Sequence, residues 1–236
     1  KTDEEARNYK VDQSFVNQMI NASALDNGLH AGDLKFVDLD GNNKIEQTTS
    51  ANDRKDMKVI GNSLPRYNYN LGISADWYGI DFSVLFQGIG KQNWYPGAET
   101  SMFWGPYSRP YASFIPSDFM SQVWSEENSN AYFPRPRGYV ALGSNRELAV
   151  VNTKYLQNLA YCRLKNLSIG YTLPDKWLSK IGFEKIRVYF SGENLLTFTK
   201  LHSDYIDPEQ ASASNSWKTS KSDANIYPWA KTYSFG

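Results

Sequence analysis

The sequence predicts an all-β fold whose antiparallel strands are long enough to cross a lipid bilayer. Apolar and polar residues alternate without a break over 66–77, and an apolar row continues over 80–91 after a short turn at Tyr78-Gly79. A tilted strand needs about 9–11 residues to span a bilayer, whereas strands of soluble proteins are usually about 5–6 residues long. The two segments therefore predict a hairpin that is oversized for an ordinary soluble protein.

Further strands are expected over about 155–173, over 186–199 and from Trp229 to Phe235. The apolar row of the first of these changes phase halfway, which predicts a β-bulge near Leu164. The connections alternate between short and long, as in outer-membrane barrels, which place short turns in the periplasm and long loops outside.

This pattern makes the long segments 92–153 and 200–226 extracellular. Five strands cannot close a barrel, because about eight is the smallest number seen. We therefore expect strands outside this sequence to complete the sheet, and we expect the chain to be an internal piece of a longer one.

The region before the first strand has a different character. Residues 3–22 carry acidic residues in a first turn and apolar residues at every fourth position, which predicts a helix. Residues 28–61 are rich in Asp, Asn and Gly, which is typical of an ordered loop. We accordingly divide the chain into an extracellular loop region, 1–65, and a region of barrel strands with their loops, 66–236.

Composition excludes several classes of protein. The 236 residues carry 25 basic and 25 acidic side chains, so no bulk charge attracts nucleic acid. No apolar run approaches the roughly 20 residues of a membrane helix. Cys162 is the single cysteine, so an intrachain disulfide is excluded. Aromatic residues make up 15% of the chain, which suits both a membrane barrel with aromatic girdles and a soluble sugar-binding β protein.

An Asp- and Asn-rich turn is a candidate site for a divalent cation such as Ca²⁺ or Mg²⁺. Places one, three, five and seven of a calcium-loop spacing are occupied by Asp38, Asp40, Asn42 and Lys44. The twelfth place lacks the usual Glu, and Asp53 could replace it after an insertion. The alternative is a turn held by side-chain hydrogen bonds alone. In either case the role would be to stiffen a loop.

The long segment after the hairpin offers flat aromatic faces. Candidate substrate-binding residues, which could stack on sugar rings, are Trp94, Tyr95, Trp104 and Tyr107. Neighbouring aromatics such as Tyr111 and Phe114 belong to the same segment. The alternative is that these rings build the small core of the loop itself. The sequence marks no catalytic constellation and no paired carboxylates, so we expect no enzyme and no cofactor beyond the candidate cation.

Several motifs, in order along about 30–236, carry a resemblance to a known family. They include Gly32–Ile45 (GDLKFVDLDGNNKI), Phe86–Gly88 (FQG), Trp124, Arg163–Pro174 (RLKNLSIGYTLP), Gly192–Leu195 (GENL) and Asp207–Glu209 (DPE). Together they resemble the C-terminal quarter of SusC/RagA-like TonB-dependent outer-membrane transporters.

The resemblance implies the C-terminal antiparallel strands of a barrel of about 22 strands, plugged by an N-terminal domain that this sequence does not include. It also implies a multi-pass location in the outer membrane, a SusD-like surface lipoprotein as partner, and energy supplied by TonB through the absent N-terminal region. The usual cargo of such transporters is oligosaccharide, less often peptide.

The rival interpretation is a soluble, secreted β-sandwich that binds glycans. A sandwich also produces alternating strands, but its apolar rows face one another across a dry core. In a transporter, residues such as Leu71, Val84 and Ile169 would point into lipid instead. The surroundings of these rows therefore separate the two interpretations.

Overall fold

The computed structural model describes residues 1–13, 29–48, 50, 52–108, 115–143, 146–180, 182–214 and 228–236. These residues form two compact units. Unit 1 is built from the described parts of 1–61 and 95–156, and unit 2 from 62–94, 157–214 and 228–236. In the part of the chain covered by the structure, no helix is both long and apolar enough to cross a membrane.

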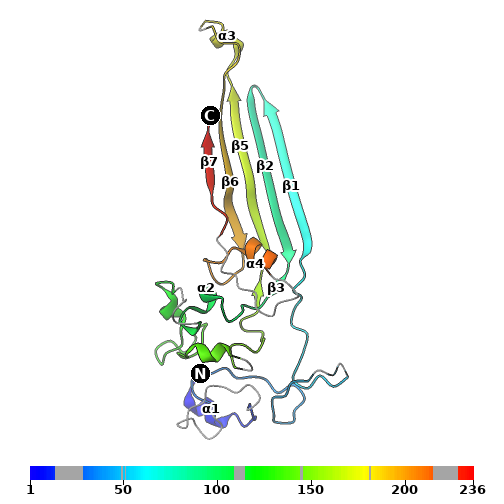
Figure 1. The fold of residues 1–236 in the computed structure, drawn as a ribbon, viewed down its shortest axis with the longest axis vertical. Coiled ribbons are helices and arrows are strands. Elements are labelled where there is room, and N and C mark those ends of the chain that lie inside the picture. Colours follow the sequence, from blue (N-terminus) through cyan, green and yellow to red (C-terminus); the bar gives the residue numbers. More distant parts are fainter. Residues whose placement is uncertain are drawn as a thin grey trace. The chain divides into compact units, whose positions relative to one another are not determined.

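Unit 2 is dominated by one antiparallel sheet of five strands in the order β1-β2-β5-β6-β7 (Figure 1). The strands are β1 (Arg66–Trp77), β2 (Ile80–Lys91), β5 (Tyr161–Thr172), β6 (Arg187–Thr199) and β7 (Thr232–Phe235). The first two coincide with the predicted hairpin, and the other three lie within the predicted segments. The antiparallel β architecture predicted from the alternating pattern is therefore confirmed.

The two faces of this sheet differ in chemistry because residues paired across strands share a face. On one face Ile73 is paired with Val84, and Val84 with Leu167. On the other face Ser74 is paired with Ser83, and Ser83 with Ser168. The apolar face is open: Leu71 is 54% exposed, Ile73 50% and Val188 58%. An exposed apolar sheet face of this size is not expected in water.

Aromatic residues frame the apolar face at both ends. The row at the hairpin turn contains Trp77 and Tyr171, and a row near the opposite end contains Tyr69 and Phe198. Tyr67 lies one row further, over Gly90. With a rise of about 3.3 Å per residue and a tilt of about 40°, successive rows on one face differ in depth by about 5 Å. The aromatic rows are thus about 20–25 Å apart, close to the height of about 25 Å of a barrel's lipid-facing band.

The predicted bulge is present. The pairing of β5 with β2 and with β6 shifts between Leu164 and Asn166, which leaves Lys165 as an extra residue. On β6 the irregularity includes Asn194 in the left-handed conformation, at φ 52°, which Asn tolerates better than most residues. A Cβ on Gly192 would lie 2.7 Å from the side chain of Leu195. The GENL motif therefore has a structural reason: its Gly makes room for its Leu, and its Asn turns the bulge.

The described strands do not form a closed barrel. Within the described residues β1 and β7 each pair with one strand only and are the edges of the sheet. Unpaired strand edges cannot lie in lipid, because each unsatisfied backbone group costs several kcal/mol there. An arrangement in a bilayer thus requires neighbouring strands at both edges.

The remaining elements are short. In unit 1 they are α1 (Asp3–Asn8), α2 (Ser101–Trp104) and the 3₁₀ helices η2 (Gly105–Tyr107), η3 (Phe119–Gln122) and η4 (Tyr139–Leu142). In unit 2 they are the pair β3 (Asn93–Trp94) and β4 (Gln157–Asn158), and the helices α3 (Asp175–Leu178) and α4 (Pro208–Ser214).

The helix predicted over 3–22 is shorter than expected. It begins as predicted, with the side chain of Thr2 accepting the N–H of Glu5 at 3.2 Å, but α1 ends at Asn8. The extension over 9–13 is wrong, because Asp12 instead exchanges backbone hydrogen bonds with Asn43 (2.9 Å) and Ile45 (2.7 Å). Residues 14–22 of the prediction lie outside the described residues.

Candidate functional sites

A cluster of aromatic rings forms the core of unit 1. The ring centroids of Trp104 and Tyr155 are 5.2 Å apart, and those of Phe119 and Phe133 are 4.6 Å apart. Phe103 meets Trp104 edge to face at 4.8 Å. Each such pair adds about 0.5–1.5 kcal/mol beyond the burial of its area. This cluster therefore stabilises a segment that contains little regular secondary structure.

Of the four aromatic residues predicted to bind substrate, Tyr95, Trp104 and Tyr107 lie in unit 1, whereas Trp94 lies in unit 2. Trp104 is 0% exposed, and its Nε1 donates to the carbonyl oxygens of Pro96 (3.2 Å) and Gly97 (3.0 Å). Tyr107 is also buried, and its hydroxyl donates to the carbonyl of Pro134 at 2.7 Å. The backbone thus satisfies the polar atoms of both rings.

Tyr95 is held in a similar way. The Tyr95 hydroxyl donates to the carbonyl of Leu148 at 2.8 Å and accepts from Nδ2 of Asn152 at 2.9 Å. Trp94 is buried in β3 of unit 2. In the described arrangement these rings pack as core residues, the alternative left open above, and Tyr111 and Phe114 lie outside the described residues. Contact with cargo stays a prediction and would require the rings to be uncovered.

Burial also keeps the tyrosines of this core protonated. Desolvation raises the pKa of the hydroxyl groups of Tyr95, Tyr107 and Tyr155 far above its ordinary value. The hydroxyl groups of these tyrosines are therefore neutral when they form the hydrogen bonds of the core.

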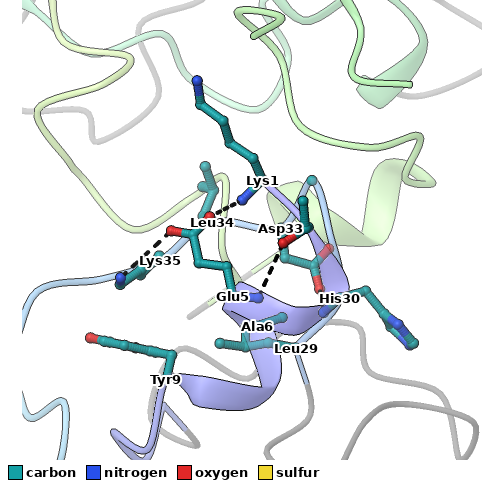
Figure 2. A pocket seen from close by; sticks show the side chains of 11 residues that line it. Lys1, Glu5, Ala6, Tyr9, Leu29, His30, Asp33, Leu34 and Lys35 are labelled. Atoms are coloured by element: carbon teal, nitrogen blue, oxygen red, sulfur yellow. Dashed lines mark hydrogen bonds and ion pairs between the residues drawn. The ribbon is translucent and has the colours of Figure 1, made fainter. Parts of the chain in front are cut away.

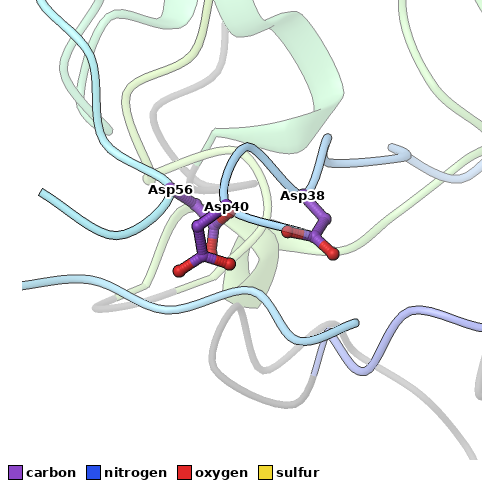
Figure 3. Close-up of side chains that lie close together, drawn as sticks. All are labelled: Asp38, Asp40 and Asp56. Carbon is purple, nitrogen blue, oxygen red and sulfur yellow. The ribbon is translucent and has the colours of Figure 1, made fainter. Parts of the chain in front are cut away.

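The acidic turn brings carboxylates together (Figure 3). Ligand oxygens of Asp38, Asp40 and Asp56 all lie within 4.8 Å of one another. Asp38 accepts the backbone N–H groups of Gly41 and Asn43, each at 2.7 Å. Burial opposes ionisation of Asp38, but these N–H donors outweigh it and hold the pKa of its carboxyl below the usual value.

Two predicted ligands, Asn42 and Lys44, serve the turn itself. Oδ1 of Asn42 accepts the N–H of Lys44 at 2.8 Å, and the Lys44 ammonium lies 3.3 Å from Glu46. Asp53 is not grouped with the other aspartates, and its carboxylate lies 3.5 Å from the ammonium of Lys55. The third carboxylate comes from Asp56, which sequence spacing did not single out.

The acidic turn meets the chemical requirement for Ca²⁺ or Mg²⁺, which prefer carboxylate oxygens. However, both oxygens of Asp56 already accept backbone N–H groups, from Leu39 at 2.6 Å and Glu46 at 2.7 Å. The geometry thus supports a turn held by hydrogen bonds, and a bound cation stays a prediction.

Unit 1 also contains two hollows. An open groove of about 680 Å³ runs beside this turn and is lined largely by apolar side chains such as Phe36, Leu39, Met57 and Val151. A much smaller pocket of about 40 Å³ lies against α1, where Glu5, Tyr9 and Lys35 surround it (Figure 2). Its size is that of a water site rather than of a ligand site.

These features define a class of protein. A sheet of long strands with one apolar open face, one polar face and aromatic residues at both ends is typical of transmembrane β-sheet proteins. The aromatic core belongs to the long segment between β2 and β5, and the acidic turn belongs to the segment that precedes β1. This class agrees with the first of the two interpretations of the sequence.

Known proteins narrow the class to a family. The chain is 31% identical over 207 residues to TonB-dependent receptor P3 of Formosa agariphila, covering 85% of the chain and 18% of the receptor. It is 27% identical over 192 residues to TonB-dependent receptor P26 of the same organism, covering 80% and 17%. The chain is therefore homologous to one segment of the TonB-dependent receptors, and the resemblance carried by its motifs is confirmed.

The likeness to solved structures is weaker. The RagAB peptide importer in its open-open state matches with a TM-score of 0.46 and 22% identity, over 79% of this chain and 18% of that one. No protein-family model matches the chain. The curated relatives are receptors, in agreement with the expectation that the chain is not an enzyme. The chain spans about a fifth of the length of the relatives it matches.

Proposed function

We propose that the chain forms part of the wall and of the outer loops of a SusC/RagA-like, TonB-dependent importer in the outer membrane. Homology to TonB-dependent receptors over 85% of the chain supports the family. In this role the five long strands of unit 2 are adjacent strands in the C-terminal part of the barrel. The segments 92–153 and 200–226, together with 1–65, then lie on the extracellular side.

The observation that carries this proposal is the contrast between the two faces of the sheet. On the apolar face, Ile73, Val84 and Leu167 form one continuous row across three strands. On the polar face, Asp81 accepts from Nε of Arg187 at 2.8 Å across Gly170, which leaves the space that the two side chains fill. Lipid contact accounts for the first face, and a water-filled channel with plug contacts accounts for the second.

The sandwich alternative requires a second sheet over the apolar rows. Apart from the main sheet, the described residues form a second sheet, the β3–β4 pair with two residues per strand, and two isolated bridges, which are too small for that purpose. A soluble glycan-binding sandwich is therefore the weaker candidate.

For cargo and partners we propose oligosaccharides, taken up together with a SusD-like lipoprotein over the outer mouth. An N-terminal plug and TonB would complete the importer. Peptides are the second candidate, because the RagAB structures are described as those of a peptide importer. In the acidic turn, Asp38, Asp40 and Asp56 would hold a structural Ca²⁺ ion.

The test uses the natural full-length protein in its host. The proposal expects it in the outer-membrane fraction, soluble only in detergent, and expects its deletion to abolish uptake of a labelled oligosaccharide or peptide. Loss of TonB should abolish the same uptake. Recovery of the protein in the soluble fraction without detergent would refute the proposal, and a panel of labelled glycans and peptides decides the cargo class.

A further inference from the structure

We propose that two cations of β5 and two carboxylates of the loop after β6 form a latch that holds this loop against the polar face of the sheet. The polar latch consists of Arg163, Lys165, Asp207 and Glu209. It unites two motifs, RLKNLSIGYTLP and DPE, that lie more than 30 residues apart in the sequence.

Arg163 is the centre of the polar latch. Its Nη2 donates to Asp207 at 2.6 Å, its Nη1 to Glu209 at 2.8 Å and its Nε to Oγ1 of Thr197 at 2.9 Å. The guanidinium side chain is only 2% exposed. Each of the three guanidinium nitrogens therefore donates to an acceptor, as expected of a specific buried ion pair.

Asp207 connects three separate parts of unit 2. Besides binding Arg163 on β5, its Oδ1 accepts the N–H groups of Glu209 (2.9 Å) and Gln210 (3.4 Å) at the start of α4. Its Oδ2 also accepts the N–H of Trp229, at 3.3 Å, just before β7. One carboxylate thus holds both the beginning and the end of the segment between 207 and 229.

The bulge in β5 supplies the second cation. Lys165 is the extra residue of the bulge, and its ammonium lies 3.0 Å from Glu209 and 4.9 Å from the centre of the Trp229 ring. Bulges commonly re-aim a side chain in this way. On β6, Nδ2 of Asn194 donates to the carbonyl of Ala230 at 3.2 Å. This bond holds the residues that lead into β7.

These contacts make the polar latch a fixed attachment point rather than a gate that opens. Opening the polar latch would leave a buried guanidinium without its counter-charges, which is strongly unfavourable. Resting on the function proposed above, the polar latch holds the two ends of an outer loop against the channel side of the barrel wall.

The test measures amide hydrogen exchange in the natural full-length protein in detergent. In Arg163→Met, exchange at Glu209, Gln210 and Trp229 should accelerate at least about tenfold, because local opening no longer breaks an ion pair. Ladder amides of β2, β5 and β6 should keep their protection. The matched control is Arg187→Met, which removes the same charge from the same face and should leave the loop amides unchanged.

Unchanged exchange of the loop amides in Arg163→Met would overturn the proposal. If that variant also loses protection in the ladder, Asp207→Asn decides: it keeps the shape of the helix cap but removes the charge, and unchanged loop exchange there overturns the proposal. Amide exchange is measured without cargo, so a protein that does not import would not for that reason show unchanged exchange in the variants. If Arg163→Met accelerates exchange of the loop amides but leaves uptake of the labelled cargo unchanged, the attachment of the loop is supported and its role at the channel mouth is refuted.

Discussion

An arginine at Val84 tests the orientation of the sheet in lipid. Val84 pairs with Ile73 and Leu167 in the second row beyond that of Trp77. At about 5 Å of depth per row, it lies about 10 Å from that end of a band about 25 Å high, close to the midplane. An arginine there should destabilise the folded protein by about 2–4 kcal/mol, and one at Ile169, a row nearer the interface, by less.

The neighbouring Ser83 provides the control, because its side chain lies on the polar face opposite Ser74 and Ser168. Ser83→Arg should change stability by about 0.5 kcal/mol or less. The assay is the free energy of unfolding of the natural full-length protein in lipid vesicles, followed by tryptophan fluorescence in urea. Equal losses for both variants, or a larger loss at Ser83, would refute the assignment of the faces.

Three further predictions concern unit 1. Gly32 has φ 82°, and an added Cβ would collide with the ring of Trp124, so Gly32→Ala should lower the free energy of unfolding by about 2 kcal/mol or more, measured by denaturant titration. The raised pKa of the Tyr155 hydroxyl adds stability that is present below about pH 10, where unfolded tyrosine ionises, and is lost as pH rises further. Tyr155→Phe should therefore weaken the alkaline loss of stability, and an unchanged profile would contradict the burial. If the acidic turn holds Ca²⁺, removing calcium with a chelator should lower the thermal midpoint of the protein, and Asp56→Asn should abolish the difference; calcium independence would leave only the hydrogen-bonded turn.

The strands could be predicted because their signal is local. Alternation over 66–77 determines the side to which each residue points, and the register then follows from the short turn at Tyr78-Gly79. The change of phase near Leu164 likewise appears in the sequence alone. β7 was predicted too long, because the N–H of Trp229 donates to Asp207 rather than to a neighbouring strand.

Features that depend on distant partners could not be predicted. The helix after Asn8 is replaced by pairing between Asp12 and Lys44, which the helical spacing does not show. The third aspartate of the acidic turn depends on how the chain folds back, so loop spacing suggested Asp53 whereas the structure places Asp56 there. The pairing of Arg163 with Asp207 likewise has no signal in a single sequence, apart from the presence of both residues in motifs.

Some motif residues acquired a physical reason only from the structure. Gly88 of the FQG motif faces Tyr69, whose hydroxyl donates to the carbonyl of Tyr161 at 2.9 Å, and an added Cβ would collide with that ring. An aromatic ring over a strand glycine compensates for the missing side chain. The sequence shows the Gly and the Tyr, but only the cross-strand register shows that they meet.

The most direct test of the central claim is the surroundings of alternate residues along β1. Spin labels placed singly at Asn70, Leu71, Ile73 and Ser74 of the natural full-length protein in lipid vesicles would be probed with apolar oxygen and with a water-soluble nickel complex. The account predicts that labels at Leu71 and Ile73 are reached by oxygen, and that labels at Asn70 and Ser74 are reached by the nickel complex or shielded by the plug. Access of the nickel complex to Leu71 and Ile73, or equal access of oxygen to all four positions, would contradict the placement of this face in lipid.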